Sequence, residues 1–239
     1  MTRSAPDTIA VVGTVAPWLD VDASSRIQLG HTVAATAERH LDSHEHLFLE
    51  GQRQSHVYIV LEGVVGLYKL VADGRRQITS FAYRGDMIGL DCPKVHGDSA
   101  EALCSVRVRA IPLGAIDKLI ASEPGFGQTL LRIAAEEIAD TRERLVSLGR
   151  KSAAEKVAGF LLRLMRRNAA LGREGEILEL PMKRTDIADF LGLTIETVSR
   201  NFTRLRTARV IGMRSTTEIE ILDLERLRAL ADGEEARSD

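Results

Sequence analysis

The periodicity of the sequence changes near Pro112, and this change restricts the fold more than any other feature of the chain. Between about residue 33 and Pro112, short β-prone runs alternate with turn signals that contain glycine. The turns are Glu50-Gly51, Glu62-Gly63, Asp73-Gly74 and Arg84-Gly85-Asp86. Strand pairs joined by such turns predict an antiparallel, jelly-roll-like β-barrel. Because helical patterns follow, the chain is expected to belong to the α+β class with the barrel at its N-terminus.

A seven-residue repeat of apolar side chains runs through residues 126–148. Leu131, Ile138 and Leu145 form one series, and a second series follows it by three residues: Ala134, Thr141 and Leu148. These are the spacings of the a and d positions of a coiled coil. They predict a long helix that pairs in parallel with a second copy of itself. The alternative is an amphipathic helix packed on its own barrel, although such a helix usually carries a wider apolar stripe.

The long helix is expected to end near Gly149, because Ser152 and Glu155 have the spacing of a capping box at the start of another helix. The apolar spacing of that helix reaches Met165, and residues 166–176 are expected to form a polar loop before a short strand at 177–181. The sequence therefore predicts a barrel domain over 1–125, a dimerisation helix over 126–149 and a third domain over 150–239.

The segment from 184 to 200 has the pattern of a helix-turn-helix. Ala188 supplies the small side chain needed where two helices cross, and Gly192 supplies a residue that tolerates positive φ in the turn. Thr194 is a suitable N-cap for the second helix. Apolar residues close the angle between the helices: Ile187, Leu191, Leu193 and Val198. One position departs from the usual pattern, because Asn201 stands where an aliphatic residue is common.

Two β-prone runs, at 210–211 and 219–221, flank a polar loop and predict the hairpin of a winged helix-turn-helix. Residues 150–214 hold 14 Lys/Arg against 7 Asp/Glu, whereas the whole chain holds 32 against 34. A basic segment within an acidic protein suits a face that meets phosphates. A solvated helical surface would give the same charge, so the charge alone does not decide between these interpretations.

The first turns of the second helix carry side chains that can read base edges. Arg200 suits guanine, Glu196 can accept a hydrogen bond from a base amino group, and Ser199 can contact either partner of a pair. Other polar side chains are candidates for phosphate oxygens: Lys183, Thr185, Thr194, Thr197, Thr203, Arg204 and Arg206. The domain is therefore expected to bind double-stranded DNA.

From about residue 30 onward the chain resembles the CRP/FNR superfamily of bacterial transcription regulators. The motifs are the barrel with its glycine turns, Tyr83-Arg84-Gly85-Asp86-Met87-Ile88-Gly89, the heptad helix, and Glu196-Thr197-Val198-Ser199-Arg200. The last is similar to the Glu-x-x-Ser-Arg reader of the FNR and FixK branches. That resemblance implies a TTGAT half-site with its inverted repeat, in which Arg200 contacts guanine, Glu196 the cytosine side and Ser199 a thymine. It also implies a homodimer that recruits RNA polymerase, usually at genes for low-oxygen life.

Two departures from the family's motifs restrict the branch of the superfamily that this chain can resemble. The branch that responds to cyclic AMP needs an Arg-Ser pair for the ligand phosphate, and here Asp98 precedes Ser99, so a carboxylate would repel the anion. The cluster-binding cysteines of FNR are absent from the N-terminus, and Cys92 and Cys104 do not replace them. The chain is thus similar to FixK-type regulators, which implies that it works without a cofactor.

Other interpretations of the barrel remain open at this point. His44, His46 and Glu50 have the spacing of a cupin metal motif and would share one face of a strand, which would suit a non-haem iron enzyme. A haem or another small molecule could also occupy the barrel. The two cysteines are interpreted as neutral thiols.

The chain is expected to be a cytoplasmic protein with no membrane segment. The apolar stretch at residues 9–16 has little positive charge before it and no small-residue cleavage site after it. Two cysteines are too few to hold a chain of this size together by disulfides, which also indicates a reducing compartment.

Overall fold

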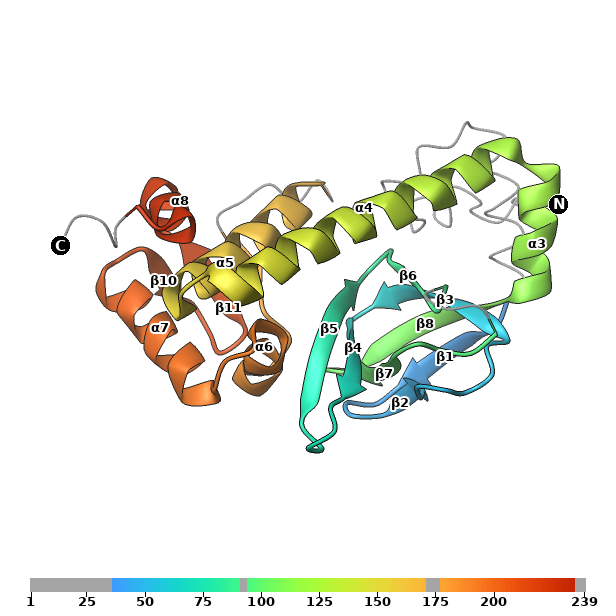
Figure 1. Ribbon diagram of the computed structural model, residues 1–239, viewed down its shortest axis with the longest axis horizontal. Coiled ribbons are helices and arrows are strands. Elements are labelled where there is room, and N and C mark those ends of the chain that lie inside the picture. The colour runs from blue at the N-terminus through green and yellow to red at the C-terminus, as the bar shows by residue number, and fades with distance from the viewer. Residues whose placement is uncertain (1–35, 91–93, 171–176, 235–239) are drawn as a thin grey trace, which may run out of the picture. The chain divides into compact units, whose positions relative to one another are not determined.

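The computed structural model describes residues 36–90, 94–170 and 177–234, which divide into two compact units (Figure 1). The first unit includes Thr79–Glu137 and the chain up to Lys69, and the second comprises Leu70–Ile78 and Ile138–Asp239. The apolar stretch at 9–16 and Cys92 lie outside the described residues.

The first unit is built on two four-stranded sheets, which confirms the α+β fold with an antiparallel, jelly-roll-like N-terminal body. One sheet has the order β1-β8-β3-β6 and the other β2-β7-β4-β5. The strands are β1 (Glu38–Leu41), β2 (His46–Phe48), β3 (His56–Glu62), β4 (Val64–Leu70), β5 (Arg76–Tyr83), β6 (Met87–Ile88), β7 (Ser99–Ala102) and β8 (Val106–Pro112). Strand β8 lies between β1 and β3 and pairs with both of them in the antiparallel sense.

The glycine turns predicted from the sequence are present, and each of their glycines has a positive φ. Gly63 shows why glycine is needed in the turn between β3 and β4. Its φ is +80°, and a Cβ atom there would lie 2.4 Å from the carbonyl oxygen of Ser105. A larger residue would therefore meet both backbone strain and a steric clash.

The hydrophobic core of the first unit lies between the sheets and beneath helix α3 (Leu113–Ser122). Strand β3 is buried over five consecutive residues, Val57–Leu61, instead of alternating residues. One side of this strand packs in the core of the barrel, and the other contributes to a cluster with Ile116, Leu119 and Phe126. A strand covered on both faces reads as a continuous apolar run, as β3 does.

Two long helices follow, α4 (Pro124–Arg150) and α5 (Ala153–Ala170). The predicted capping box is present, because the Ser152 amide donates to Glu155 Oε2 at 3.2 Å and the Glu155 amide donates to Ser152 Oγ at 3.3 Å. The expected loop at 166–176 was wrong in its first part, since helix α5 extends to Ala170. Arg166 and Arg167 are good helix formers, and they continue the helix beyond the end of its apolar spacing.

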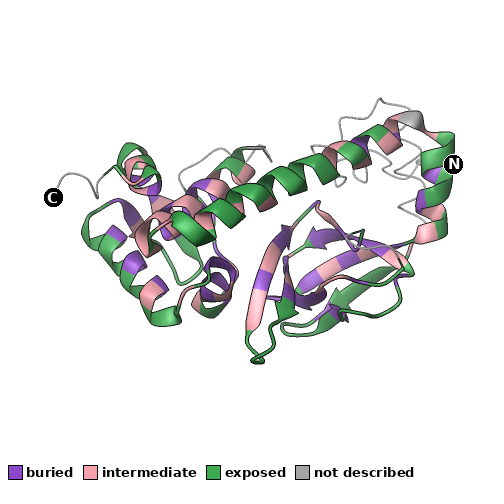
Figure 2. Cartoon of the chain, viewed as in Figure 1, coloured by how far each residue is buried: buried purple, intermediate pink, exposed green. Residues whose placement is uncertain are grey.

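Helix α4 carries its apolar seam on an exposed surface, as Figure 2 shows over much of the helix. Leu131 is 73% exposed, Ile138 53% and Leu145 66%. The interpretation of this helix as one that buries its seam on its own barrel is therefore not supported in the described part of the chain.

The second unit contains α6 (Arg184–Leu191), α7 (Ile195–Thr207) and α8 (Leu224–Asp232) around a three-stranded antiparallel sheet. The sheet has the order β10-β11-β9, from Ile211–Met213, Glu218–Ile221 and Ile177–Glu179. Strands β10 and β11 form the predicted hairpin wing, and α6 and α7 form the predicted helix-turn-helix. The core of this unit includes Phe160, Leu161, Ile187, Phe202 and Leu227.

A strained residue follows helix α7 and gives a stability prediction. Arg209 is exposed and has a φ of +55°, which costs a residue with a Cβ about 1–2 kcal/mol. We expect Arg209→Gly to remove much of this strain and to raise the Tm of the protein by roughly 2–4 °C per kcal/mol recovered. Thermal unfolding followed by circular dichroism would measure it. The control is Arg206→Gly within helix α7, which should lower the Tm, and a lower Tm for both variants would contradict the prediction.

Candidate nucleic-acid interface

The turn between α6 and α7 is closed by Gly192, as the sequence predicted. Gly192 adopts the left-handed conformation, with φ 63° and ψ 42°, and its amide donates to the carbonyl of Ala188. Ala188 is buried, so the two helices approach closely at this position. A Cβ on Gly192 would lie 3.3 Å from Leu148 Cδ2, so the end of α4 packs against the turn.

Helix α7 has a buried side and an exposed side. Val198, Phe202 and Leu205 face the core of the unit. The three residues predicted to read bases, Glu196, Ser199 and Arg200, are all exposed. Because they are three and four positions apart, they share one face of the helix. The structure therefore brings the three base-reading candidates together on the open side of α7.

A chain of hydrogen bonds orders the first two turns of this face. Thr194 caps the helix, because its Oγ1 accepts from the Thr197 amide at 3.3 Å, and it also donates to Thr197 Oγ1 at 3.1 Å. Arg200 Nη2 in turn donates to Thr197 Oγ1 at 3.2 Å while the arginine remains exposed. Thr197 is itself only half-buried, and its hydroxyl connects the cap to Arg200.

The unusual Asn201 is explained by a local hydrogen bond. Its side chain is 8% exposed, and Nδ2 donates to the carbonyl oxygen of Thr197 at 2.8 Å. A buried amide is tolerated when its polar atoms have partners. Phe202, the next residue, is buried in the core of the unit.

Sequence reasoning missed Arg184, which connects three parts of the unit. Its guanidinium carbon lies 3.5 Å from the centroid of the Phe202 ring, and Nη2 lies 3.9 Å from Met213 Sδ on the wing. Burial lowers the pKa of Arg184 from its ordinary value. A cation over an aromatic face is attracted to the ring, and this contact ties α6 to α7. No local sequence signal distinguishes Arg184 from the other arginines of the segment.

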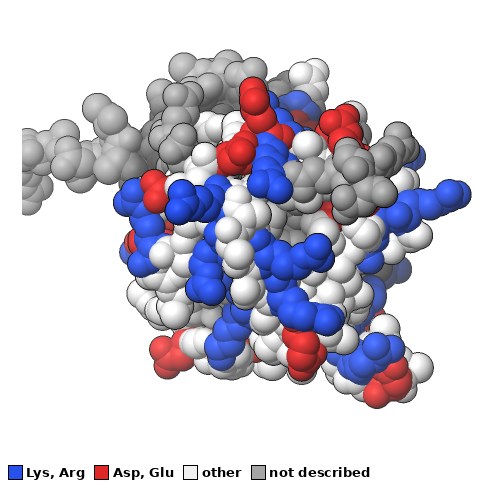
Figure 3. Space-filling view, turned by 90° about the vertical axis from the view of Figure 1, so that its left-hand side faces the viewer, with Lys and Arg blue, Asp and Glu red and all other residues white. Residues whose placement is uncertain are grey.

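The candidate phosphate contacts lie mostly on the surface of the second unit. Lys183, Thr185, Thr203, Arg204 and Arg206 are exposed, as is Thr194. Figure 3 shows Lys and Arg side chains distributed over the side of the unit that carries α7 and α8, with fewer acidic side chains. This surface can attract the phosphate backbone of a duplex.

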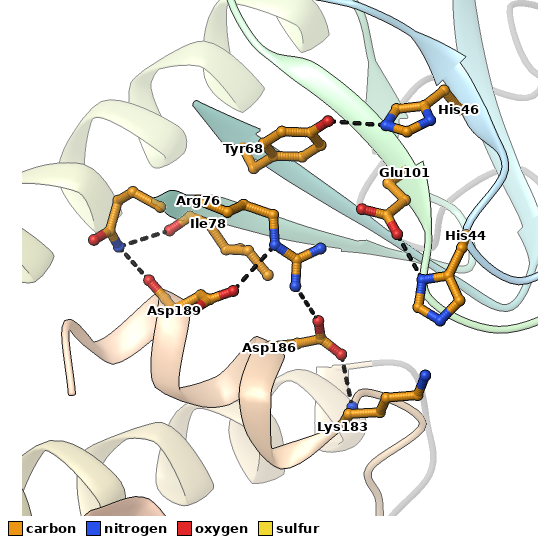
Figure 4. A network of polar contacts seen from close by, with 10 residues as sticks. His44, His46, Tyr68, Arg76, Ile78, Glu101, Lys183, Asp186 and Asp189 are labelled. Carbon is orange, nitrogen blue, oxygen red and sulfur yellow. Dashed lines mark hydrogen bonds and ion pairs between the residues drawn. The ribbon is translucent and has the colours of Figure 1, made fainter. Parts of the chain in front are cut away.

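The candidate metal ligands of the barrel do not form a site. His44 lies outside the strands with a φ of 73°, and its Nδ1 is 2.6 Å from Glu101 Oε1 (Figure 4). His46 Nε2 is 2.8 Å from the Tyr68 hydroxyl, and Glu50 accepts from Lys69 Nζ at 2.9 Å. The expectation that the three share one strand face was wrong, because the chain turns at His44. Within the described residues, no three His, Cys, Asp or Glu side chains gather as a metal ion would require.

Asp98 is held by neighbours in the barrel. Its Oδ2 accepts from Thr79 Oγ1 at 2.8 Å, and Oδ1 lies 3.6 Å from Lys69 Nζ. The hydrogen bond with Glu50, with a smaller contribution from Asp98, raises the pKa of Lys69. The cation and the hydroxyl that face Asp98 therefore already have an anionic partner.

Two smaller observations concern the rest of the chain. Cys104 is a half-buried free thiol that packs beside the barrel core. The helices of residues 36–90, 94–170 and 177–234 are all too short or too polar to span a bilayer.

Comparisons with known proteins agree with both units. Residues 38–123 match the cyclic nucleotide-binding domain family, and residues 155–230 match the Crp-like helix-turn-helix domain. The chain is 43% identical to the nitrogen fixation regulation protein FixK of Bradyrhizobium diazoefficiens, over 80% of this chain and 81% of that protein. It is 42% identical to the transcriptional activatory protein AadR of Rhodopseudomonas palustris, over 78% of each chain.

The solved structure of FixK2 from Bradyrhizobium japonicum is also similar, with a TM-score of 0.77 and 35% identity over 82% of this chain and 97% of that chain. These relatives are named as regulators, FixK as a nitrogen fixation regulation protein and AadR as a transcriptional activatory protein. The chain therefore belongs to the CRP/FNR superfamily of DNA-binding transcription regulators, in the FixK-like branch that includes activators.

Proposed function

We propose that this protein binds a TTGAT-like inverted repeat as a homodimer and activates transcription there by recruiting RNA polymerase in the cytoplasm. The observation that carries the proposal is the ordered, exposed face of α7, with Glu196, Ser199 and Arg200 on one side of a capped helix. A bidentate arginine, a carboxylate acceptor and a hydroxyl can together distinguish neighbouring base pairs in the major groove.

The homodimer is supported by the exposed seam of α4. Its members are Leu131, Ala134, Ile138, Thr141, Leu145 and Leu148, and three of its large side chains are more than half exposed. Pairing of two such helices would remove this apolar surface from water. In a two-fold dimer, both copies of α7 can enter successive major grooves on one side of the duplex.

DNA binding without a cyclic nucleotide is supported by the barrel. Asp98 places a carboxylate among Thr79 and Lys69, so an incoming phosphodiester would meet a negative charge there. The relatives named as nitrogen fixation regulation proteins suggest that the target genes concern nitrogen, and the resemblance to the FNR and FixK branches adds genes for low-oxygen life.

Selection of bound sequences from a random DNA library, with purified protein and no added ligand, tests this function directly. We expect an enriched inverted repeat with TTGAT half-sites. A control selection uses protein with Glu196, Ser199 and Arg200 all changed to alanine, which should enrich no common motif. Enrichment of the same repeat by both proteins, or of none by the native protein, would contradict the proposal.

Arg204 gives a prediction about the phosphate backbone. It is exposed near the end of α7, and we expect Arg204→Ala to weaken binding to all sequences alike. The slope of log K against log[salt] should fall by about 0.9 for each phosphate that the variant no longer neutralises. Titrations at several salt concentrations measure the slope, with a duplex that carries the repeat and one that does not. Weaker binding to the repeat alone would show that Arg204 reads bases.

A further inference from the structure

The segment Leu70–Ile78 belongs structurally to the second unit, although it is far from that unit in sequence. Leu70 is the last residue of β4, residues 71–75 form the turn, and Arg76–Ile78 begin β5. The side chains of Arg76 and Gln77 contact helix α6. Figure 4 shows Arg76 between two carboxylates of α6, those of Asp186 and Asp189.

Asp186 is the most buried of the charged groups in this network. Its side chain is 3% exposed, and its Oδ2 accepts from the Lys183 amide at 2.8 Å. That hydrogen bond caps the N-terminus of α6. Its other oxygen, Oδ1, accepts from Arg76 Nη2. The two oxygens of one buried carboxylate thus join the start of α6 to Arg76.

A second set of contacts fixes the next turn of the same helix. Arg76 Nε donates to Asp189 Oδ2 at 3.0 Å, and Gln77 Nε2 donates to the backbone carbonyl of Asp189. Asp186 and Asp189 are three positions apart, so one guanidinium contacts the same face of α6 at two successive turns. Two points of contact restrain the rotation of the helix as well as its position.

Loss of Arg76 would leave a buried carboxylate without its cation, which is costly in an environment of low polarity. The start of α6 would then move, or water would enter, so that Asp186 is solvated. Helix α6 carries Ala188, Leu191 and the Gly192 turn against α7, so a shift of α6 displaces the exposed face of α7. Small displacements of reading side chains weaken interactions that depend on geometry.

We infer that Arg76 is a positioning residue of the DNA-binding unit. It holds α6, and therefore the reading face of α7 (the exposed face with Glu196, Ser199 and Arg200), in place without contacting DNA itself. This inference rests on the proposed DNA-reading role of α7. The segment Leu70–Ile78 then stabilises the position of α6 in the DNA-binding unit, in addition to connecting two strands of the barrel.

Arg75 supplies a matched control for the test. It lies in the same turn, its side chain is 82% exposed, and it pairs with Asp73 in that turn. Arg76→Ala and Arg75→Ala remove the same charge, so they alter the general attraction to DNA equally. We expect Arg76→Ala to weaken binding to a duplex with the TTGAT repeat about tenfold or more, and Arg75→Ala to stay within about twofold of the native protein.

Hydrogen–deuterium exchange of the DNA-free proteins gives a readout that does not depend on α7 reading DNA. Amides of residues 183–191 should exchange faster in Arg76→Ala than in Arg75→Ala, while those of 155–165 in α5 should be unchanged. Faster exchange throughout the unit would mean general destabilisation and would overturn the positioning role. Equal exchange and equal affinity in the two variants would also overturn it.

A change at Asp186 tests the pairing itself. Asp186→Asn keeps an oxygen for the Lys183 amide but removes the charge that needs Arg76. We expect Arg76→Ala to cost at least several-fold less affinity in the Asp186→Asn background than in the native one, and an undiminished cost would contradict the inference. If Arg76→Ala does not fold, Arg76→Lys replaces it in both backgrounds under the same criterion. If neither the native protein nor Arg75→Ala bound the repeat, the proposed DNA-binding function would be wrong. The positioning role of Arg76 would still be tested, because hydrogen–deuterium exchange is measured without DNA.

Discussion

The Arg200→Ala variant is expected to bind a TTGAT inverted repeat more weakly by about 1–3 kcal/mol, or roughly 5- to 150-fold. Arg200 is exposed on the reading face of α7, where its planar guanidinium can donate to guanine O6 and N7 together. The effect should concentrate at one base pair, so that the variant accepts other bases at the guanine position. Competition binding with duplexes substituted one position at a time, at fixed salt, measures both the affinity and the preference.

Arg204→Ala is the matched control for this experiment, because it removes the same charge four residues later on the same helix. It should weaken every duplex to a similar degree and leave the order of preference unchanged. If Arg200→Ala kept native affinity for the repeat, or weakened all sequences alike, the assignment of Arg200 to a base would be wrong.

A glutamate at position 138 is expected to convert the protein to a monomer. Ile138 is 53% exposed at the middle of the α4 seam, with Leu131 and Leu145 one heptad away on either side. Pairing of the Ile138→Glu chains would bring two like-charged carboxylates close together on the apolar seam, where taking a charge out of water is costly. Sedimentation velocity should show a monomer, and affinity for the inverted repeat should fall by about 100-fold or more, because the two half-sites can no longer be bound together.

Ala139→Glu provides the control, since it adds the same charge at an exposed neighbouring position outside the seam. It should remain dimeric and bind the repeat about as well as the native protein. A dimer for Ile138→Glu would mean that the chains pair through another surface. A monomer that binds the inverted repeat with native affinity would mean that the chains bind DNA singly.

Local signals explain why much of the DNA-binding unit could be predicted from the sequence. The cap at Thr194, the positive φ of Gly192 and the capping box of Ser152 and Glu155 each depend on residues within four positions of one another. The turns of the barrel could be predicted for the same reason, because each needs a glycine at one position of the turn. The periodicity of the apolar residues then predicted the helices and strands that lie between these caps and turns.

Contacts between distant residues could not be predicted in this way. Arg76 and Asp186 are 110 positions apart, and nothing near either residue indicates that they pair. The contact of the Arg184 guanidinium with the Phe202 ring could not be predicted either, because it depends on the angle between two helices. The candidate metal motif failed for the opposite reason: its spacing suited a strand, but the backbone turns at His44 and sends the three side chains to different partners.

The hydrogen bond from Arg200 to Thr197 also affects the entropy of recognition. A free arginine samples many rotamers, and ordering it at an interface costs about 0.5–1.5 kcal/mol. Here Thr194 orders Thr197, and Thr197 orders the guanidinium, so part of that freedom is already removed in the unbound protein. In the proposed complex, DNA would therefore meet a side chain that is partly preorganised, and a larger share of the proposed guanine interaction would remain available for discrimination between sequences.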